Sequence, residues 1–232
     1  MPHSENDQTM LTFVRGLFSG AQFKATIAIL YVCVAASVWK TAIFPTEGFW
    51  PGTYRIFGAF LLLGVIPAGI VKYIFREKLV DYGLGLGDWP RTVRSTLIMM
   101  PLLIFLGYMT GCDKSFLNVY PLNPAIRPGA AVSVFLLHLA SYLFYYVGWE
   151  FMFRGFLQKA TQSQAGPFTA ILIQTMASTM LHYGHPASEV FGAILGGLFW
   201  GFLAYKTRSL WAGFIQHTIL GFTLDTILVY GP

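Results

Sequence analysis

Seven apolar stretches, separated by polar connections, make up most of the chain. A helix needs about 20 apolar residues to cross the hydrocarbon core of a bilayer, and in lipid every backbone polar group must bond within its own segment. We therefore expect each stretch to form a helix and the chain to be an all-α, polytopic membrane bundle of about seven transmembrane helices. The stretches cover residues 23–44, 54–75, 95–112, 130–160, 167–183, 188–205 and 209–229.

Composition agrees with this pattern. Of the 232 residues, 55% are hydrophobic and only 11% are charged, whereas a soluble domain carries about 25% charged residues. The sequence shows no internal repeat and no low-complexity linker, so we expect residues 1–232 to form a single integral membrane domain. Residues 1–22 are predicted to be a cytoplasmic or interfacial segment.

The distribution of basic residues predicts the orientation in the membrane. The loop between the second and third stretches, together with its flanks, is rich in them: Lys72, Arg76, Lys78, Arg91 and Arg94. The positive-inside rule places this loop and the N-terminus in the cytoplasm and the C-terminus outside. The net charge of +5 therefore reflects topology, and no nucleic-acid partner is expected. We expect a multi-pass protein of the cell membrane, namely the inner membrane of a prokaryote.

Ionisable residues inside the later apolar stretches are the main functional candidates. Glu150 and Arg154 lie one turn apart in the fourth stretch, His182 ends the fifth and His217 lies within the seventh. A charged side chain in the middle of a bilayer costs about 2.5–3.5 kcal/mol even on the lenient insertion scale, which makes such residues functional candidates. Each also has a structural interpretation, as a self-neutralising i,i+4 pair or a histidine bonded to a neighbouring helix.

Three further polar residues are supporting candidates: His185, Glu189 and Asp225. With a rise of about 1.5 Å per residue, counting from the turns puts His182, Glu189 and Asp225 at one depth. Glu150 and His217 lie a turn or more away. We therefore treat all of these residues as members of one potential cluster.

Three short motifs, in this order, resemble the CAAX protease and bacteriocin-processing (CPBP) family of intramembrane endopeptidases. The family motifs are E-E-x-x-x-R, F-x-x-x-H and H-x-x-x-N or D, and this chain has "WEFMFR", "STMLH" and "SLWAGFIQHTILG". The resemblance covers about residues 130–222. It implies a catalytic-type core built from helices four to seven, within residues 130–230.

This sequence departs from the family motifs at Trp149, Ser178 and Gly221. The first departure replaces the leading glutamate, a favoured candidate for activating water in the family. The resemblance therefore leaves two alternatives, that Glu150 does this work or that the protein is inactive. Glu189 and Asp225 are candidates to replace a missing carboxylate.

The resemblance implies hydrolysis of a peptide bond in a membrane-associated protein or peptide. We expect Glu150 to activate the water, Arg154 to fix its orientation, and His182 and His217 to donate to the oxyanion or the leaving amine. No cofactor is expected. The alternative is a metal-dependent peptidase in which His182, His217 and Glu150 bind zinc, although the commonest zinc signature, H-E-x-x-H, is absent from the sequence.

The sequence also allows two interpretations without peptidase activity. One is an inactive family member that serves as a membrane scaffold or binder, and the other is a carrier whose acids and histidines relay protons. The expected partners of the peptidase are membrane lipid and a peptide or protein substrate. Glycines four residues apart in the sixth stretch also predict close helix contacts: Gly192 and Gly196, and Gly197 and Gly201.

Overall fold

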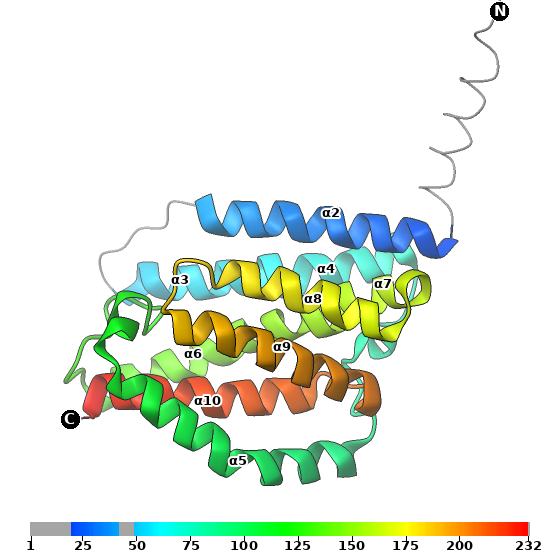
Figure 1. Ribbon diagram of the computed structural model, residues 1–232. Helices are drawn as coiled ribbons and strands as arrows, with labels where there is room; N and C mark the ends of the chain where they lie inside the picture. The colour runs from blue at the N-terminus through cyan, green and yellow to red at the C-terminus, as the bar shows by residue number, and fades with distance from the viewer. Residues whose placement is uncertain (1–19, 42–48, 232) are drawn as a thin grey trace, which may run out of the picture.

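The computed structural model describes residues 20–41 and 49–231, and within them it consists of helices joined by turns (Figure 1). Two of the long helices contain π-helical stretches without a break in the rod, and the label η marks these stretches and two short 3₁₀ helices. The first half of the chain forms α2 (Gly20–Thr41), then one rod made of α3 (Phe49–Phe60), η1 (Leu61–Val65), α4 (Ile66–Gly69) and η2 (Ile70–Phe75), then the 3₁₀ helix η3 (Leu79–Tyr82), α5 (Trp89–Cys112) and the 3₁₀ helix η4 (Lys114–Asn118). The second half forms one rod made of α6 (Val132–Glu150), η5 (Phe151–Leu157) and α7 (Gln158–Ala165), followed by α8 (Pro167–Leu181), α9 (Ala187–Thr207) and α10 (Trp211–Tyr230).

These elements confirm the predicted all-α membrane bundle. Six of the described helices are long and apolar enough to cross a membrane, and α8 is a shorter apolar helix. With 15 residues, α8 is about 22 Å long, less than the thickness of a bilayer core. The predicted N-terminal segment 1–22 lies outside the described residues as far as residue 19, and α2 begins at Gly20.

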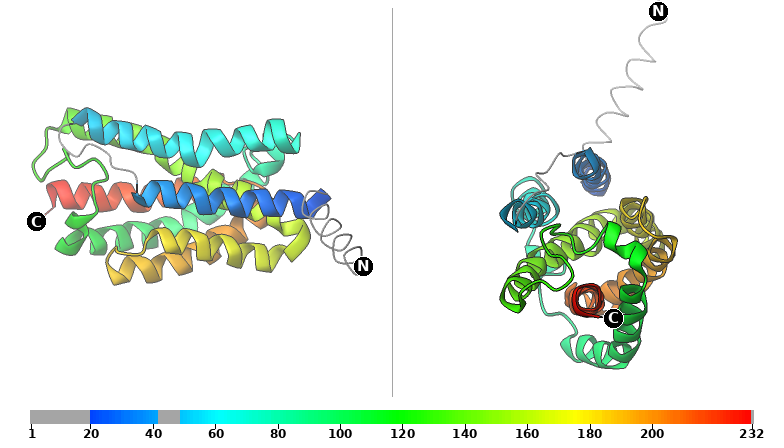
Figure 2. Two further views of the ribbon diagram at one scale, coloured as in Figure 1. Left: turned by 90° about the horizontal axis from the view of Figure 1, so that it is seen from above. Right: turned by 90° about the vertical axis from the view of Figure 1, so that its left-hand side faces the viewer.

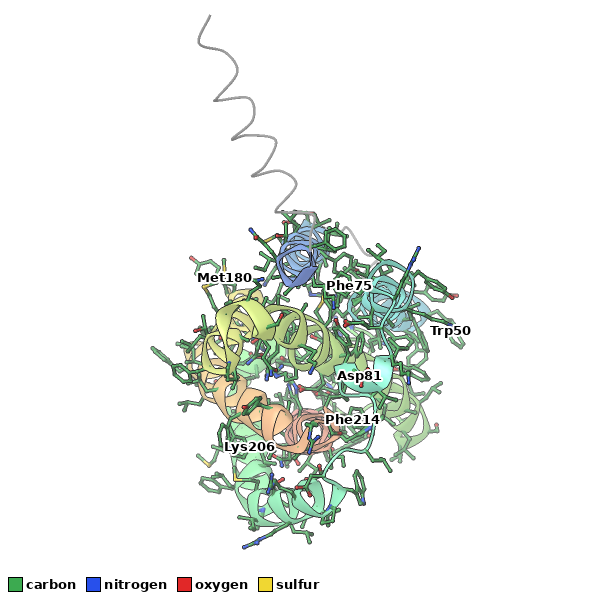
Figure 3. All side chains as sticks on the ribbon, turned by 90° about the vertical axis from the view of Figure 1, so that its right-hand side faces the viewer. Trp50, Phe75, Asp81, Met180, Lys206 and Phe214 are labelled. Atoms are coloured by element: carbon green, nitrogen blue, oxygen red, sulfur yellow. The ribbon has the colours of Figure 1, made fainter. Side chains whose placement is uncertain are left out.

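The helices lie side by side, and α10 is the most enclosed of those long enough to span. The end-on view in Figure 2 shows α10 between α5, α6 and α9. Half of the apolar window of α10 is buried within the protein, against 17% for α2. Figure 3 shows side chains such as Trp50 and Met180 projecting from the outside of the bundle, where 61% and 68% of their surfaces are exposed. The polar groups of α10 are therefore shielded by neighbouring helices.

The basic loop lies at one end of the bundle and is bound to the turn between α9 and α10. The backbone N–H of Asp88 donates to the Thr207 carbonyl over 2.8 Å, and the Ser209 hydroxyl donates to the Gly85 carbonyl over 2.8 Å. Asp88 also accepts a hydrogen bond from the Arg91 N–H and caps α5. The two hydrogen bonds between the loop and the turn fix the start of α10 relative to the start of α5. The side of the membrane that this end faces stays a prediction.

A small polar cluster fixes α2 to the same end of the bundle. The Lys24 ammonium and the Tyr82 hydroxyl each donate to the Glu77 carboxylate over 2.6 Å. Partial burial alone would raise the pKa of Glu77, but these two hydrogen bonds and the nearby positive charges lower it overall. Glu77 is therefore ionised at neutral pH and holds α2 against the loop.

The glycines of α9 divide into two pairs, of which one makes the predicted contacts. A Cβ at Gly201 would lie 2.5 Å from Nε2 of Gln174 on α8, and one at Gly197 would lie 2.8 Å from Cγ2 of Thr175. Among the described residues, nothing lies within 4 Å of a Cβ at Gly192, and a Cβ at Gly196 would face the ring of Trp200 on its own helix. The spacing therefore predicted close packing correctly for Gly197 and Gly201. It was wrong for Gly192 and Gly196.

We expect Gly201→Ala to destabilise the bundle by about 1–3 kcal/mol, because the added methyl overpacks a closed helix interface. The amide of Gln174 is fully buried and donates to the Gly197 carbonyl over 2.8 Å, so it cannot move without losing that bond. Thermal unfolding of the purified protein in detergent measures the effect. Gly192→Ala in the same helix is the matched control and should leave the midpoint unchanged or raise it. Equal destabilisation by both variants would contradict the proposed contact.

Candidate functional site

One face of the long helix formed by α6, η5 and α7 carries five polar side chains at intervals of four residues: His138, Tyr142, Tyr146, Glu150 and Arg154. All five are buried, with exposed fractions between 0% and 6%. Residues four apart in an α-helix share a face, and this face is turned towards α10. A wider π-helical turn, η5, follows Glu150 directly. Such turns are frequent at functional sites.

Glu150 is fully enclosed and lies at the centre of this face. Its Oε1 is 3.0 Å from Nδ1 of His217 on α10 and 3.4 Å from Nη1 of Arg154 on its own helix. Its other oxygen, Oε2, is buried and has no hydrogen-bond partner among the described residues. A Cβ at Gly213 would lie 2.5 Å from Oε2, so the glycine makes room for the carboxylate.

His217 is held by rings on two sides. Its ring stacks on Trp200 of α9 at a centroid distance of 4.6 Å and contacts Tyr146 at 4.8 Å. A carboxylate oxygen accepts, so Nδ1 of His217 is the donor in the contact with Glu150. The side chain of His217 is 17% exposed, unlike that of Glu150. His217 thus connects the enclosed carboxylate with the more open part of the site.

A second polar cluster lies where α8 ends and α9 begins. Oε1 of Glu189 accepts a hydrogen bond of 2.5 Å from the Tyr120 hydroxyl, and it lies 3.0 Å from Nδ1 of His185 and 3.8 Å from Nε2 of His182. Nδ1 of His182 lies 2.8 Å from the Ser178 carbonyl, which fixes the ring. Burial raises the pKa of Tyr120 well above its ordinary value, so the hydroxyl stays protonated and donates.

Trp149 lies between the two clusters. The centroid of its ring is 5.3 Å from that of His182 and 6.4 Å from that of His217, both edge-on. Only 3% of its surface is exposed. The residue that replaces the leading glutamate of the first motif therefore fills the space between the two candidate histidines.

The structure places Asp225 elsewhere than expected. Its Oδ2 lies 2.9 Å from Nε2 of His138, and both side chains are fully buried. His138 is a residue that the sequence reasoning did not select, although it lies three intervals of four residues before Glu150. Asp225 forms a helix–helix contact between α6 and α10, two turns away from His217 along α10.

Comparisons with known proteins bear on this arrangement. Residues 131–223 match the family model described as type II CAAX prenyl endopeptidase Rce1-like. We refer to this matched stretch as the Rce1-like domain. The resemblance to the CPBP family is thereby confirmed at the level of a protease family. Comparison with curated proteins and with solved structures gave no match.

The Rce1-like domain begins at α6 and ends within α10, so it contains both polar clusters around Trp149 except for Tyr120. Glu150, Arg154 and His217 form one cluster, and the other consists of Tyr120, which precedes the domain, and His182, His185 and Glu189. Asp225 falls just outside the matched residues. The roles predicted for the individual residues stay predictions.

A zinc site does not fit the side chains as they are placed. Within the part of the chain that the structure describes, no group of three histidine, cysteine, aspartate or glutamate side chains is arranged to hold a metal ion. Glu150 and His217 bond to each other, and His182 belongs to the other cluster. No step of the proposed reaction below therefore uses a metal.

The contact between His138 and Asp225 is expected to stabilise the Rce1-like domain. Asp225→Leu leaves a buried imidazole without its acceptor and should lower the free energy of unfolding by about 1–3 kcal/mol. Thermal unfolding in detergent measures this loss. His138→Leu combined with Asp225→Leu should cost less than the sum of the single variants, since no polar group is then left unpaired. Strict additivity would contradict the contact.

Proposed function

We propose that the chain is an intramembrane endopeptidase in which Glu150 activates the attacking water. The supporting observation is the state of the carboxylate. Oε1 is engaged by His217 and Arg154, whereas Oε2 is buried and has no partner among the described residues. A buried polar atom of this kind calls for an explanation, and a water held on Oε2 supplies one.

The proposed reaction is a general-base hydrolysis. Oε2 of Glu150 takes a proton from the water as the water oxygen bonds to the peptide carbonyl carbon. The electron pair of the carbonyl moves to its oxygen, and the C–N bond breaks when this pair returns. The proton then passes from Glu150 to the leaving amine. Arg154 and His217 hold the carboxylate in place, and His182 is proposed as a donor to the substrate from the far side of Trp149.

The proposed substrate is a peptide segment that reaches the site from the membrane. The description of the matched family adds a specific possibility to test, a C-terminal peptide carrying a prenyl group. A fluorogenic peptide of the CAAX type, prepared with and without a prenyl group, is a suitable probe in liposomes. Faster cleavage of the prenylated form would support that substrate class. Equal rates would point to an unmodified membrane peptide.

Glu150→Gln is expected to lower the rate of cleavage of the reporter peptide at least about 10²-fold, because a carboxamide cannot accept the proton of the water. Cleavage in liposomes measures activity, and thermal unfolding shows whether the variant still folds. Asp81→Asn changes an exposed carboxylate and is the matched control, with expected activity equal to that of the natural protein. Full activity of Glu150→Gln would contradict the mechanism.

A second candidate function, an inactive binder, is favoured by the position of Trp149. Its ring occupies the space next to both histidines where a carboxylate would have to lie. Under our proposal the natural protein cleaves the reporter and Trp149→Phe retains most of its activity. If the natural protein does not cleave the reporter and Trp149→Glu does, the result would instead support the inactive binder.

A further inference from the structure

Four basic side chains meet at the end of the bundle where the basic loop joins the turn after α9. Arg91 and Arg94 lie in the first two turns of α5, and Lys206 and Arg208 lie where α9 ends. The guanidinium of Arg91 donates from Nη1 to the Lys206 carbonyl over 3.2 Å. Figure 3 views the bundle from this end and shows Lys206 at the end of α9, beside α5. Two segments 115 residues apart in the chain thus form one positive surface, which we call the α5–α9 patch.

The positive charge of the α5–α9 patch is only partly neutralised. All four of its residues are exposed. Nη1 of Arg91 lies 3.4 Å from Oδ2 of Asp88, and in the described part of the chain this is the one ion pair that the four side chains make. Four cations and one carboxylate leave a net charge of +3. Like charges held together repel one another, so the patch favours a bound anion.

The α5–α9 patch lies at the depth where lipid headgroups lie. Arg91 and Arg94 begin one helix that is long and apolar enough to cross a membrane, and Lys206 ends another. One turn farther into each span, on the same face, is an exposed apolar residue. Ile98 follows Arg94 and is 65% exposed, and Phe202 precedes Lys206 and is 52% exposed. The patch therefore combines cations at headgroup level with apolar side chains that face the hydrocarbon.

We propose that the α5–α9 patch is a binding site for the phosphate of an anionic phospholipid, whose acyl chains lie along Ile98 and Phe202. Basic pockets between spanning helices suit anionic lipid headgroups, and a guanidinium can bind two phosphate oxygens through parallel N–H donors. The side chains of Arg94 and Arg208 make no hydrogen bond or ion pair within the described residues, so their donors are available. This site does not depend on the proposed peptidase chemistry.

The charge of the headgroup determines which lipid the patch selects. Phosphatidylglycerol presents a phosphate without a cation, whereas the quaternary ammonium of phosphatidylcholine is repelled by a patch of net charge +3. The patch also includes the end of α9, where the backbone N–H of Asp88 donates to the Thr207 carbonyl over 2.8 Å. A lipid bound across the patch therefore joins the start of α5 to the end of α9. A ligand that binds only the folded protein raises its thermal midpoint.

The test titrates the full-length protein in detergent micelles with dioleoyl phosphatidylglycerol or dioleoyl phosphatidylcholine and follows thermal unfolding. We expect phosphatidylglycerol alone to raise the midpoint. Arg94→Gln combined with Arg208→Gln should weaken its binding by about fivefold for each charge removed. Lys72→Gln combined with Lys78→Gln removes the same charge from exposed positions at the same end of the bundle. This matched control should bind phosphatidylglycerol as the natural protein does.

Three outcomes would overturn the proposal. Equal weakening in both double variants would show that positive charge at this end acts diffusely. Equal stabilisation by phosphatidylcholine would show that the charge of the headgroup is not recognised. Equal stabilisation by soluble glycerophosphoglycerol would assign the patch to a free phosphate compound instead of a lipid. If the variant at Arg94 and Arg208 does not fold, Lys206→Gln replaces it, with an expected weakening of about fivefold.

Discussion

The requirement that ionisable groups be enclosed within a membrane protein determines the interface between α6 and α10. In lipid, a buried charge or an unpaired polar group is costly, so these groups must meet one another. On α6 they repeat every four residues, and α10 presents His217 and Asp225 with Gly213 and Gly221 at the same interval. The glycines accept the bulk of Glu150 and Tyr146, whereas the histidine and the aspartate pair with Glu150 and His138. Polar and small residues on α10 therefore match the polar face of α6.

This interface explains why the helices are placed as they are. α10 is covered by α5, α6 and α9, and its start is fixed by hydrogen bonds between the basic loop and the turn after α9. A wider π-helical turn follows Glu150 and contains Arg154, whose Nη1 lies 3.4 Å from Oε1 of Glu150. Aromatic rings of Tyr146, Trp149 and Trp200 surround His217. They shield the pair formed by His217 and Glu150 and leave His217 as its more open member.

Much of the fold followed from the sequence, because long apolar stretches allow few structures other than spanning helices. The contact between Glu150 and Arg154 also followed from their spacing of four. The partner of Asp225, and the contact of Tyr120 with Glu189, could not be predicted in the same way. Depth along a helix is readable from residue counts, but rotation about the helix axis is not, and the rotation of α10 turns Asp225 towards His138 instead of towards His182 and Glu189. The spacing of His138 from Tyr142, Tyr146 and Glu150 was a usable signal that was missed.

The departures from the family motifs are easier to understand in space than in sequence. Trp149 and Gly221 are far apart in the chain, yet Trp149 contacts His217 and Gly221 lies one turn after it. At the first position a large apolar ring stands where the motif has a carboxylate. At the second, a residue without a side chain stands where the motif has a polar one, and the hydroxyl of Tyr146 enters that volume. One change removes a polar group from the surroundings of His217, and the other lets a different polar group in. A site altered in this way keeps a buried carboxylate bonded to His217, with His182 on the other side of Trp149, and this is the arrangement on which the proposed hydrolysis rests.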